Sequence, residues 1–228
     1  MFVFYAFLSL LALASAAKPW EEETREQWWF DRHNSFLQQT QSNPNGIRVV
    51  FLGDSITEAW LYGARSIWDQ HYASRGAVNY GIGGDRTQHI LWRIRNGELT
   101  GLTPKLVVLK IGTNNLGGAT EDEIALGIQT IVQDIRRMLP QTRILLLAVL
   151  PRNNVQWISD AVTRINTAIS KFDDGYWIRY LDMTWAFQNS HVQVKPELYD
   201  PDLLHLAVPG YQMWYQTMEP LFFDMLNY

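Results

Sequence analysis

Short apolar runs alternate along the chain with longer segments in which apolar residues recur every three or four positions. Each short run ends at a glycine, a proline or an aspartate, and uninterrupted runs of this length are typical of strands buried on both faces. The five runs span residues 48–52, 77–80, 106–111, 143–150 and 178–181. Strands alternating with helices predict a three-layer α/β/α domain built around a parallel sheet.

The longer segments predict amphipathic helices on the two faces of that sheet. One carries Ile124, Ile128, Ile131 and Ile135 on one face, is capped by Thr120, and ends before Pro140. The others are predicted over residues 20–41, 88–96, 155–172 and 211–226. A turn over residues 42–46 separates the first helix from the first strand.

The N-terminus has a different character from the rest of the chain. Residues 2–13 are apolar except for Ser9. This run is too short to span a bilayer, which takes ~20 residues of helix. Small residues follow at 14–17 and charged residues after them, a pattern typical of a signal peptide and its cleavage site. We therefore expect residues 1–17 to be a signal peptide, although the first residues contain no Lys or Arg, and we expect secretion.

Composition narrows the possible classes of protein. Of the 228 residues, 47% are hydrophobic and 18% charged, which is typical of a globular domain. The net charge of −4 is spread along the chain, so no nucleic-acid surface is expected. The absence of cysteine excludes disulfides, thiolate zinc sites and a cysteine nucleophile. We predict one domain over residues 18–228, with a helical extension at 18–45.

Polar motifs follow the predicted strands at the edge of the sheet where function gathers in such folds. Singly, each has an ordinary structural interpretation: Ser55 as a helix cap, Asn114 as a turn former, His205 as a core or surface histidine. A dinucleotide loop is disfavoured, since Arg86 stands where G-x-G-x-x-G needs its last glycine. The motifs are Gly53-Asp54-Ser55, Gly81–Asp85, Gly112–Asn115 and Asp202-Leu203-Leu204-His205.

Together these motifs fit a nucleophilic serine site. A serine needs an adjacent base, and His205 can take the proton of Ser55 near neutral pH. Asp202, three residues earlier, can hold the imidazole in one tautomer. The oxyanion of a tetrahedral intermediate would be met by the N–H groups of Ser55 and Gly84 and by the amide of Asn114.

The same motifs resemble those of the SGNH, or GDSL-type, hydrolase superfamily. Within it they are most similar to the catalytic subunits of platelet-activating factor acetylhydrolase Ib. The resemblance covers roughly residues 28–226. It is carried by residues 33–36, 51–55, 79–85, 89–93, 96–99, 111–115 and 150–152, together with Asp202 and His205.

The resemblance implies a flavodoxin-like sheet of order 2-1-3-4-5 and a metal-free ester hydrolase without a cofactor, often dimeric. It makes Ser55, Gly84, Asn114 and His205 the signature residues and Asp202 the third member of the triad. It also implies a small acyl pocket bounded by Ile56, Thr113 and Leu204. Bulky side chains there favour acetyl over longer acyl groups, by a graded ~1–3 kcal/mol per methylene.

We therefore expect a secreted serine esterase acting on a small acetylated lipid or carbohydrate. The resembled enzyme is intracellular, so its phospholipid substrate and regulatory partner are not carried over. The ten tryptophans could stack on sugars or fill the core. Two other classes remain open: a non-catalytic carbohydrate- or lipid-binding relative, and a phosphodiester or glycoside hydrolase, for which no metal cluster or carboxylate pair is evident.

Five other charged residues call for interpretation. Lys110 on a central strand is expected to pair with a carboxylate rather than act in the site. Asp85 and Arg86 could contact substrate or pair with each other. Asp182 is expected to cap a turn, and Asp200 could join Asp202 and His205 around a cation, although the triad explains two of these three better.

Overall fold

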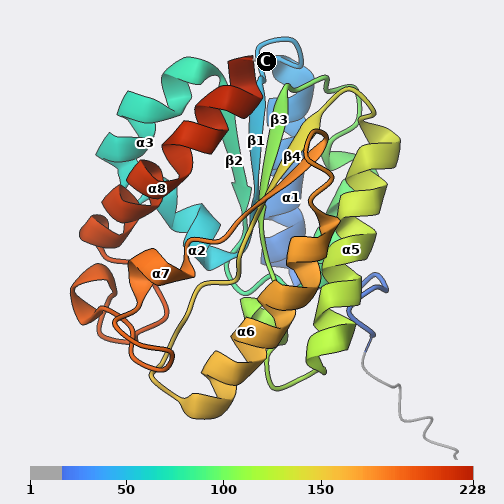
Figure 1. The fold of residues 1–228 in the computed structure, drawn as a ribbon. Coiled ribbons are helices and arrows are strands. Elements are labelled where there is room, and N and C mark those ends of the chain that lie inside the picture. The colour runs from blue at the N-terminus through green and yellow to red at the C-terminus, as the bar shows by residue number, and fades with distance from the viewer. Residues whose placement is uncertain (1–16, 228) are drawn as a thin grey trace, which may run out of the picture.

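A computed structural model describes residues 17–227, so the predicted signal peptide lies outside the described residues except for Ala17. Five parallel strands form one sheet in the order β2-β1-β3-β4-β5, which confirms the predicted fold class and order. Figure 1 shows this sheet between two layers of helices. The strands are β1 (Val49–Gly53), β2 (Ala77–Gly81), β3 (Leu106–Lys110), β4 (Arg143–Leu147) and β5 (Ile178–Leu181).

Alternate residues of the central strands supply two separate hydrophobic cores, one on each face of the sheet. On β1, Val50 and Leu52 belong to the cluster that packs under α1, α4, α5 and α6. Val49 and Phe51 face the opposite cluster, with side chains of α2, α3 and α8. This explains why the strands appear as uninterrupted apolar runs, since neither face meets water.

Apart from the start of the first helix, the predicted helices lie close to their predicted positions, and the structure adds three short ones that the sequence analysis did not predict: α2, α3 and α7. Thr120 caps α5 as expected, with its hydroxyl accepting from the Glu123 N–H. The helices are α1 (Gln27–Ser42), α2 (Ser55–Glu58), α3 (Arg65–His71), α4 (Thr87–Arg93), α5 (Glu121–Met138), α6 (Gln156–Ile169), α7 (Thr184–Phe187) and α8 (Val208–Asn227). A π-helical turn over Ile94–Glu98 extends α4.

Two predicted boundaries are wrong for identifiable reasons. The fourth strand ends at Leu147 rather than residue 150, because its neighbour β5 ends at Leu181. Beyond it, the side-chain amide of Asn166 on α6 pairs with both the N–H and the C=O of Val149, replacing a strand partner. The first helix begins at Gln27 rather than residue 20.

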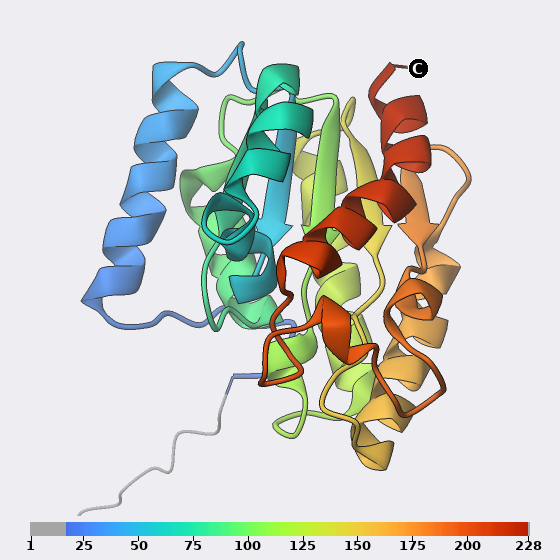
Figure 2. The ribbon, with the colours of Figure 1, turned by 90° about the vertical axis from the view of Figure 1, so that its left-hand side faces the viewer.

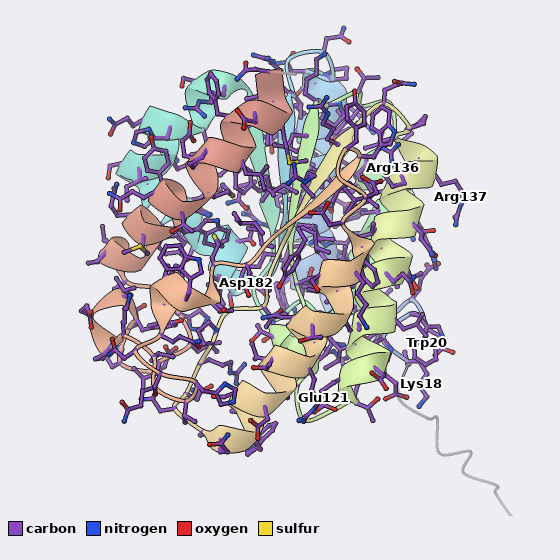
Figure 3. All side chains as sticks on the ribbon, viewed as in Figure 1. Lys18, Trp20, Glu121, Arg136, Arg137 and Asp182 are labelled. Atoms are coloured by element: carbon purple, nitrogen blue, oxygen red, sulfur yellow. The ribbon has the colours of Figure 1, made fainter. Side chains whose placement is uncertain are left out.

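Residues 17–26 instead form a strap, a non-helical segment that crosses α4 and α5. Lys18 pairs with Glu123 at 2.9 Å, and the Gln88 amide donates to the carbonyl of Ala17. Pro19 packs so closely on α5 that a Cβ at Gly127 would lie 2.5 Å from its carbonyl oxygen. Figure 3 shows Lys18 and Trp20 beside the end of α5 that begins at Glu121. In Figure 2 the strap runs past the strand arrowheads, so it borders the functional edge of the sheet.

None of the helices within residues 17–227 combines the length and apolarity needed to cross a bilayer.

Candidate active site

Ser55, His205 and Asp202 form a continuous line of hydrogen bonds at the carboxyl edge of the sheet. Ser55 Oγ lies 2.9 Å from His205 Nε2, and His205 Nδ1 lies 2.6 Å from Asp202 Oδ2. Ser55 is half-buried, and the His205 side chain is 36% exposed, so a substrate can reach both. The arrangement can transfer a proton from the serine hydroxyl to an imidazole that is oriented by a carboxylate.

The loop over residues 200–205 holds Asp202 and His205 in register. Asp202 Oδ1 accepts the backbone N–H groups of Leu204 and His205, each at 2.9 Å. The hydrogen bonds from His205 and from these two N–H groups outweigh partial burial and lower the pKa of Asp202. The carboxylate is therefore ionised at neutral pH, as the orienting role requires.

Asn153 fixes this loop from outside and was not anticipated from the sequence. Its side-chain amide donates to the Asp202 carbonyl at 3.0 Å, and its backbone N–H donates to the Leu203 carbonyl. Asn153 and Leu203 both have positive φ angles, 63° and 53°. Asparagine tolerates this region better than most residues, and the pair of contacts offsets the local backbone strain.

Ser55 is presented by an abrupt change from strand to helix. It is the first residue of α2, and Asp54 caps that helix by accepting the Ile56 N–H at 3.0 Å. The bend needs glycine at the ends of β1 and β2. A Cβ on Gly53 would lie 2.5 Å from the Lys110 carbonyl oxygen, and one on Gly81 would lie 2.4 Å from the Glu58 backbone nitrogen. The cap and the close packing together fix the position of the hydroxyl.

The loop after β2 brings Gly83 and Gly84 beside Ser55. A Cβ on Gly83 would lie 3.8 Å from Ser55 Cβ. Three N–H groups of this loop have acceptors: Ile82 donates to Gly53 O, Gly83 to Glu58 Oε2, and Asp85 to Ile82 O. Within residues 17–227 the Gly84 N–H has no such acceptor, and Gly84 is exposed with φ of +77°. It is therefore free to donate to a substrate oxygen.

Asn114 has one amide hydrogen engaged and one to spare. Its Nδ2 donates to the Asp85 carbonyl at 2.9 Å, which fixes the plane of the amide. Its neighbour Asn115 anchors the same turn by accepting the Thr87 N–H and donating to Gln88. The second hydrogen of Asn114 Nδ2 can serve as an oxyanion donor, as the sequence predicts.

The three predicted acyl-pocket residues occupy different settings around the triad. Ile56 is fully buried in one apolar cluster, and Leu204 packs against that same cluster while half-exposed. Thr113 is buried, and its hydroxyl accepts a hydrogen bond from Arg152 at 3.0 Å. The pocket itself stays a prediction.

A buried ionic network lies behind the glycine loop, and its extent was missed from the sequence. Asp85 does not pair with Arg86, which binds Glu23 instead. The Asp85 carboxylate accepts from the Trp29 indole at 2.8 Å and pairs with Arg93 at 3.0 Å and with Arg25 at 3.3 Å. Arg93 also binds Glu98 in the core. Apolar periodicity cannot reveal such a network, because its members come from the strap, α1, the glycine loop, α4 and the turn after α4.

Other charged residues have largely structural roles. Lys110 is buried with its amine 3.7 Å from Asp54 Oδ1, which confirms the predicted pairing, and burial lowers the pKa of Lys110. Asp182 caps a turn as predicted by accepting the Thr184 N–H and hydroxyl. In the described part of the chain no three His, Asp or Glu side chains are grouped as a metal site requires, and Asp200 with the triad is no exception.

The tryptophans differ in burial, with Trp20, Trp92 and Trp177 intermediate. Trp29, Trp60, Trp68 and Trp214 are buried and belong to the cores. Trp28, Trp157 and Trp185 are half-exposed or more, so sugar stacking remains open only for residues such as these.

Comparison with known proteins decides the family. Residues 51–213 match the GDSL-like Lipase/Acylhydrolase family, a span that runs from β1 into α8. The chain belongs to this family. The family and its acetylhydrolase relatives make carboxylic ester hydrolysis the class of reaction for this chain.

Relatives match over nearly the whole chain. Platelet-activating factor acetylhydrolase IB subunit alpha1 of Bos taurus is 33% identical, over 94% of this chain and 90% of its own length. Subunit alpha2 of Rattus norvegicus is 32% identical, over 87% and 85%. The structure of a GDSL-like lipase from Bacteroides thetaiotaomicron shares the fold, with a TM-score of 0.69 and 23% identity, covering 86% of this chain and 98% of that one.

Proposed function

We propose that this protein is a secreted serine esterase that hydrolyses short-acyl, chiefly acetyl, esters. The observation that carries the proposal is the hydrogen-bonded line from Ser55 Oγ through His205 to Asp202. A non-catalytic relative would have no need of this arrangement. The glycine loop, which lies against Ser55 at Gly83, and Asn114, which binds that loop at Asp85, add unused donors.

In the proposed reaction Ser55 Oγ attacks the ester carbonyl carbon, and its proton moves to His205 Nε2. The carbonyl π electrons move to the oxygen, which accepts hydrogen bonds from the Ser55 and Gly84 N–H groups and from Asn114. The C–O bond to the alcohol then breaks, and His205 returns its proton to the leaving oxygen. Water, deprotonated by His205, attacks the acyl-serine; acetate leaves, and Ser55 regains its proton.

Two observations support a short acyl group. The first is the pair of bulky aliphatic side chains, Ile56 and Leu204, that belong to or pack against one cluster beside the nucleophile. The second is that the relatives at 32–33% identity are named acetylhydrolases.

A specific feature favours a polar alcohol, such as a carbohydrate, over a lipid. A cavity of about 190 Å³ adjoins Asn114 and is lined mainly by polar and charged groups. These include Lys18, Arg86, Gln88, Asn115 and Glu123. We place the alcohol part of the substrate at this cavity, where hydroxyl groups would find both donors and acceptors.

The test is hydrolysis of p-nitrophenyl esters of increasing chain length, beside a panel of acetylated sugars and acetylated lipids assayed for freed acetate. We expect acetate esters to turn over fastest, acetylated sugars to exceed acetylated lipids, and Ser55→Ala to be silent. Equal rates for wild type and Ser55→Ala would end the esterase proposal. Faster release of octanoate than of acetate would end the short-acyl proposal alone.

Secretion has a separate test. The proposal predicts that full-length chain expressed in a secreting host appears in the medium and begins near Ala17 or Lys18 by N-terminal sequencing. A full-length chain that stays in the cell with Met1 intact would contradict it.

A further inference from the structure

The peptide group between Gly83 and Gly84 is held at its oxygen, while its N–H is left unengaged by the described part of the chain. Its N–H, on Gly84, is the predicted oxyanion donor and has no acceptor within residues 17–227. Its C=O, on Gly83, accepts a hydrogen bond from Arg25 Nη1 at 2.7 Å. Because a trans peptide is planar, its C=O and N–H point in opposite directions, so whatever holds the oxygen also aims the hydrogen.

Arg25 is itself fixed in place from several sides. Its guanidinium lies 4.6 Å from the centre of the Trp28 ring and pairs with the Asp85 carboxylate at 3.3 Å. On the glycine side, a Cβ at Gly84 would lie 3.1 Å from both Nη atoms. The Arg25 side chain is only 22% exposed, although it belongs to a surface strap. A cation held this firmly orients the peptide and draws electron density toward its oxygen, which strengthens the N–H as a donor.

The nucleophile helix holds the other side of the same loop. Glu58, one turn after Ser55 on α2, accepts the Gly83 N–H at 2.8 Å. The loop is thus tied to the serine by Glu58 and to the strap by Arg25. The Asp85 carbonyl also binds Asn114, so the Arg25–Asp85 pair bears on the second oxyanion donor as well.

We propose that Arg25 is a positioning residue of the oxyanion hole: it aims and polarises the Gly83–Gly84 peptide, and so makes the N-terminal strap part of the active site. This inference rests on the proposed esterase function. Arg25 does not touch the reacting atoms, and it acts through the Gly84 N–H. Its contribution belongs to the transition state, where the oxygen carries full negative charge, more than to the bound ester.

The first test is the split between kcat and KM for p-nitrophenyl acetate in Arg25→Ala and Arg25→Lys. We expect kcat to fall by about 10- to 50-fold in Arg25→Ala, less than the ~100- to 1,000-fold typical for losing a whole oxyanion donor, with KM within about twofold. Arg25→Lys keeps one charged donor and should recover part of the loss. A raised KM at unchanged kcat would show that Arg25 only binds substrate, and would overturn the positioning role.

Arg95→Gln is the matched control. Arg95 also ties the strap to the body of the protein, through Glu22 at 3.0 Å, but does not contact the glycine loop. We expect its kcat to stay within about twofold of wild type. If Arg95→Gln loses as much activity as Arg25→Ala, docking of the strap in general is what matters, and the specific role of Arg25 is wrong.

A trifluoromethyl ketone of short chain length gives a readout that a purely structural role would not move. Ser55 Oγ adds to its carbonyl carbon, the serine proton passes to His205, and the π electrons become an oxyanion in the predicted hole. The inhibition constant should rise in Arg25→Ala by the same factor as kcat/KM falls. An unchanged inhibition constant, with an unchanged melting temperature, would overturn the inference.

A measurement independent of turnover separates failure of the inference from failure of the proposed function. If the hydrogen bond to Gly83 O polarises the peptide, Arg25→Ala should shift the Gly84 amide ¹⁵N resonance upfield, with little change at Gly175, in a remote turn. A silent wild-type enzyme would end the esterase proposal while this resonance still tests the Arg25 contact. An unmoved Gly84 resonance would end the inference even in an active enzyme.

Discussion

The Ser55 hydroxyl lies 2.9 Å from His205 Nε2, although 150 residues separate the two in sequence. Ser55 follows a central strand, and His205 lies in the loop before the last helix. The parallel sheet brings both to one edge, because every strand ends there. Asp202 then needs only a short turn of chain to reach the far side of the imidazole.

Asp202→Asn should lower kcat by about 10³- to 10⁴-fold and leave the fold intact. An asparagine oxygen can still accept the backbone N–H groups of Leu204 and His205, but the amide favours the wrong imidazole tautomer. Steady-state kinetics beside a thermal melt checks this. Asp200→Asn, two residues away, is the control and should keep kcat within about twofold. A loss below tenfold in Asp202→Asn would remove Asp202 from the mechanism.

Leu204→Ala should change the acyl preference. Leu204 is half-exposed and packs against the apolar cluster that contains Ile56, so truncation opens space with little loss of stability. We expect the ratio of kcat/KM for butyrate over acetate to rise by about tenfold, equivalent to roughly 1.4 kcal/mol. The p-nitrophenyl ester series measures it. An unchanged ratio would mean that Leu204 does not bound the acyl group.

His89→Gln should make the protein more resistant to acid. Burial, with Arg86, Arg25 and Arg93 nearby, lowers the pKa of His89 from 6.5 to about 3. Between these values the unfolded chain binds a proton that the folded chain does not, so stability falls as pH drops below 6.5. Glutamine can still accept the Arg86 N–H that His89 Nδ1 now accepts.

Denaturant unfolding at pH 7 and pH 4.5 measures this effect. Between pH 7 and pH 4.5 the free energy of unfolding should fall by up to roughly 2–3 kcal/mol more in the wild type than in His89→Gln. His71→Gln, at a partly exposed histidine, is the control. Equal losses in wild type and His89→Gln would show that His89 takes up a proton in the folded state as readily as in the unfolded state.

Lys110→Met should destabilise the protein by about 3–5 kcal/mol, because it leaves the buried Asp54 carboxylate without a cation. Adding Asp54→Asn should restore part of the loss, since the amide still caps α2 without needing a counter-charge. Chemical denaturation of both single variants and the double variant gives the coupling energy. Lys105→Met, at an exposed position just before the same strand, is the control. If the losses of unfolding free energy in the two single variants add up in the double variant, Lys110 and Asp54 do not stabilise each other.

The sequence was sufficient to predict most of the fold because the apolar runs of the strands and the three-to-four-residue apolar spacing of the helices were both clear. The strands show as uninterrupted apolar runs since both faces are buried, and Thr120 with Glu123 marks the start of α5 through a capping box. The strap was predicted as helix because its residues are equally polar in either conformation. Its course depends on partners such as Glu123 and Arg95, which lie about 70 to 105 residues away.

In the site, too, residues in short motifs could be predicted, while residues that act through contacts remote in sequence could not. Ser55, Asp202 and His205 could be named from short motifs, since each motif carries a recognisable chemical group at a strand end. Arg25 and Asn153 carry no local signal, because each acts on the backbone of a loop remote in sequence. Glu58 could have been found, since it stands three residues after Ser55 and hence on the same face of a helix.

Labelling with a fluorophosphonate ester tests the central claim most directly. The account predicts one adduct per chain, with loss of fluoride, on the tryptic peptide that contains Ser55 by mass spectrometry. His205→Asn should slow its formation by at least ~10³-fold, and Ser55→Ala should abolish it. An adduct on another residue, or equal labelling rates in wild type and His205→Asn, would contradict activation of Ser55 by His205.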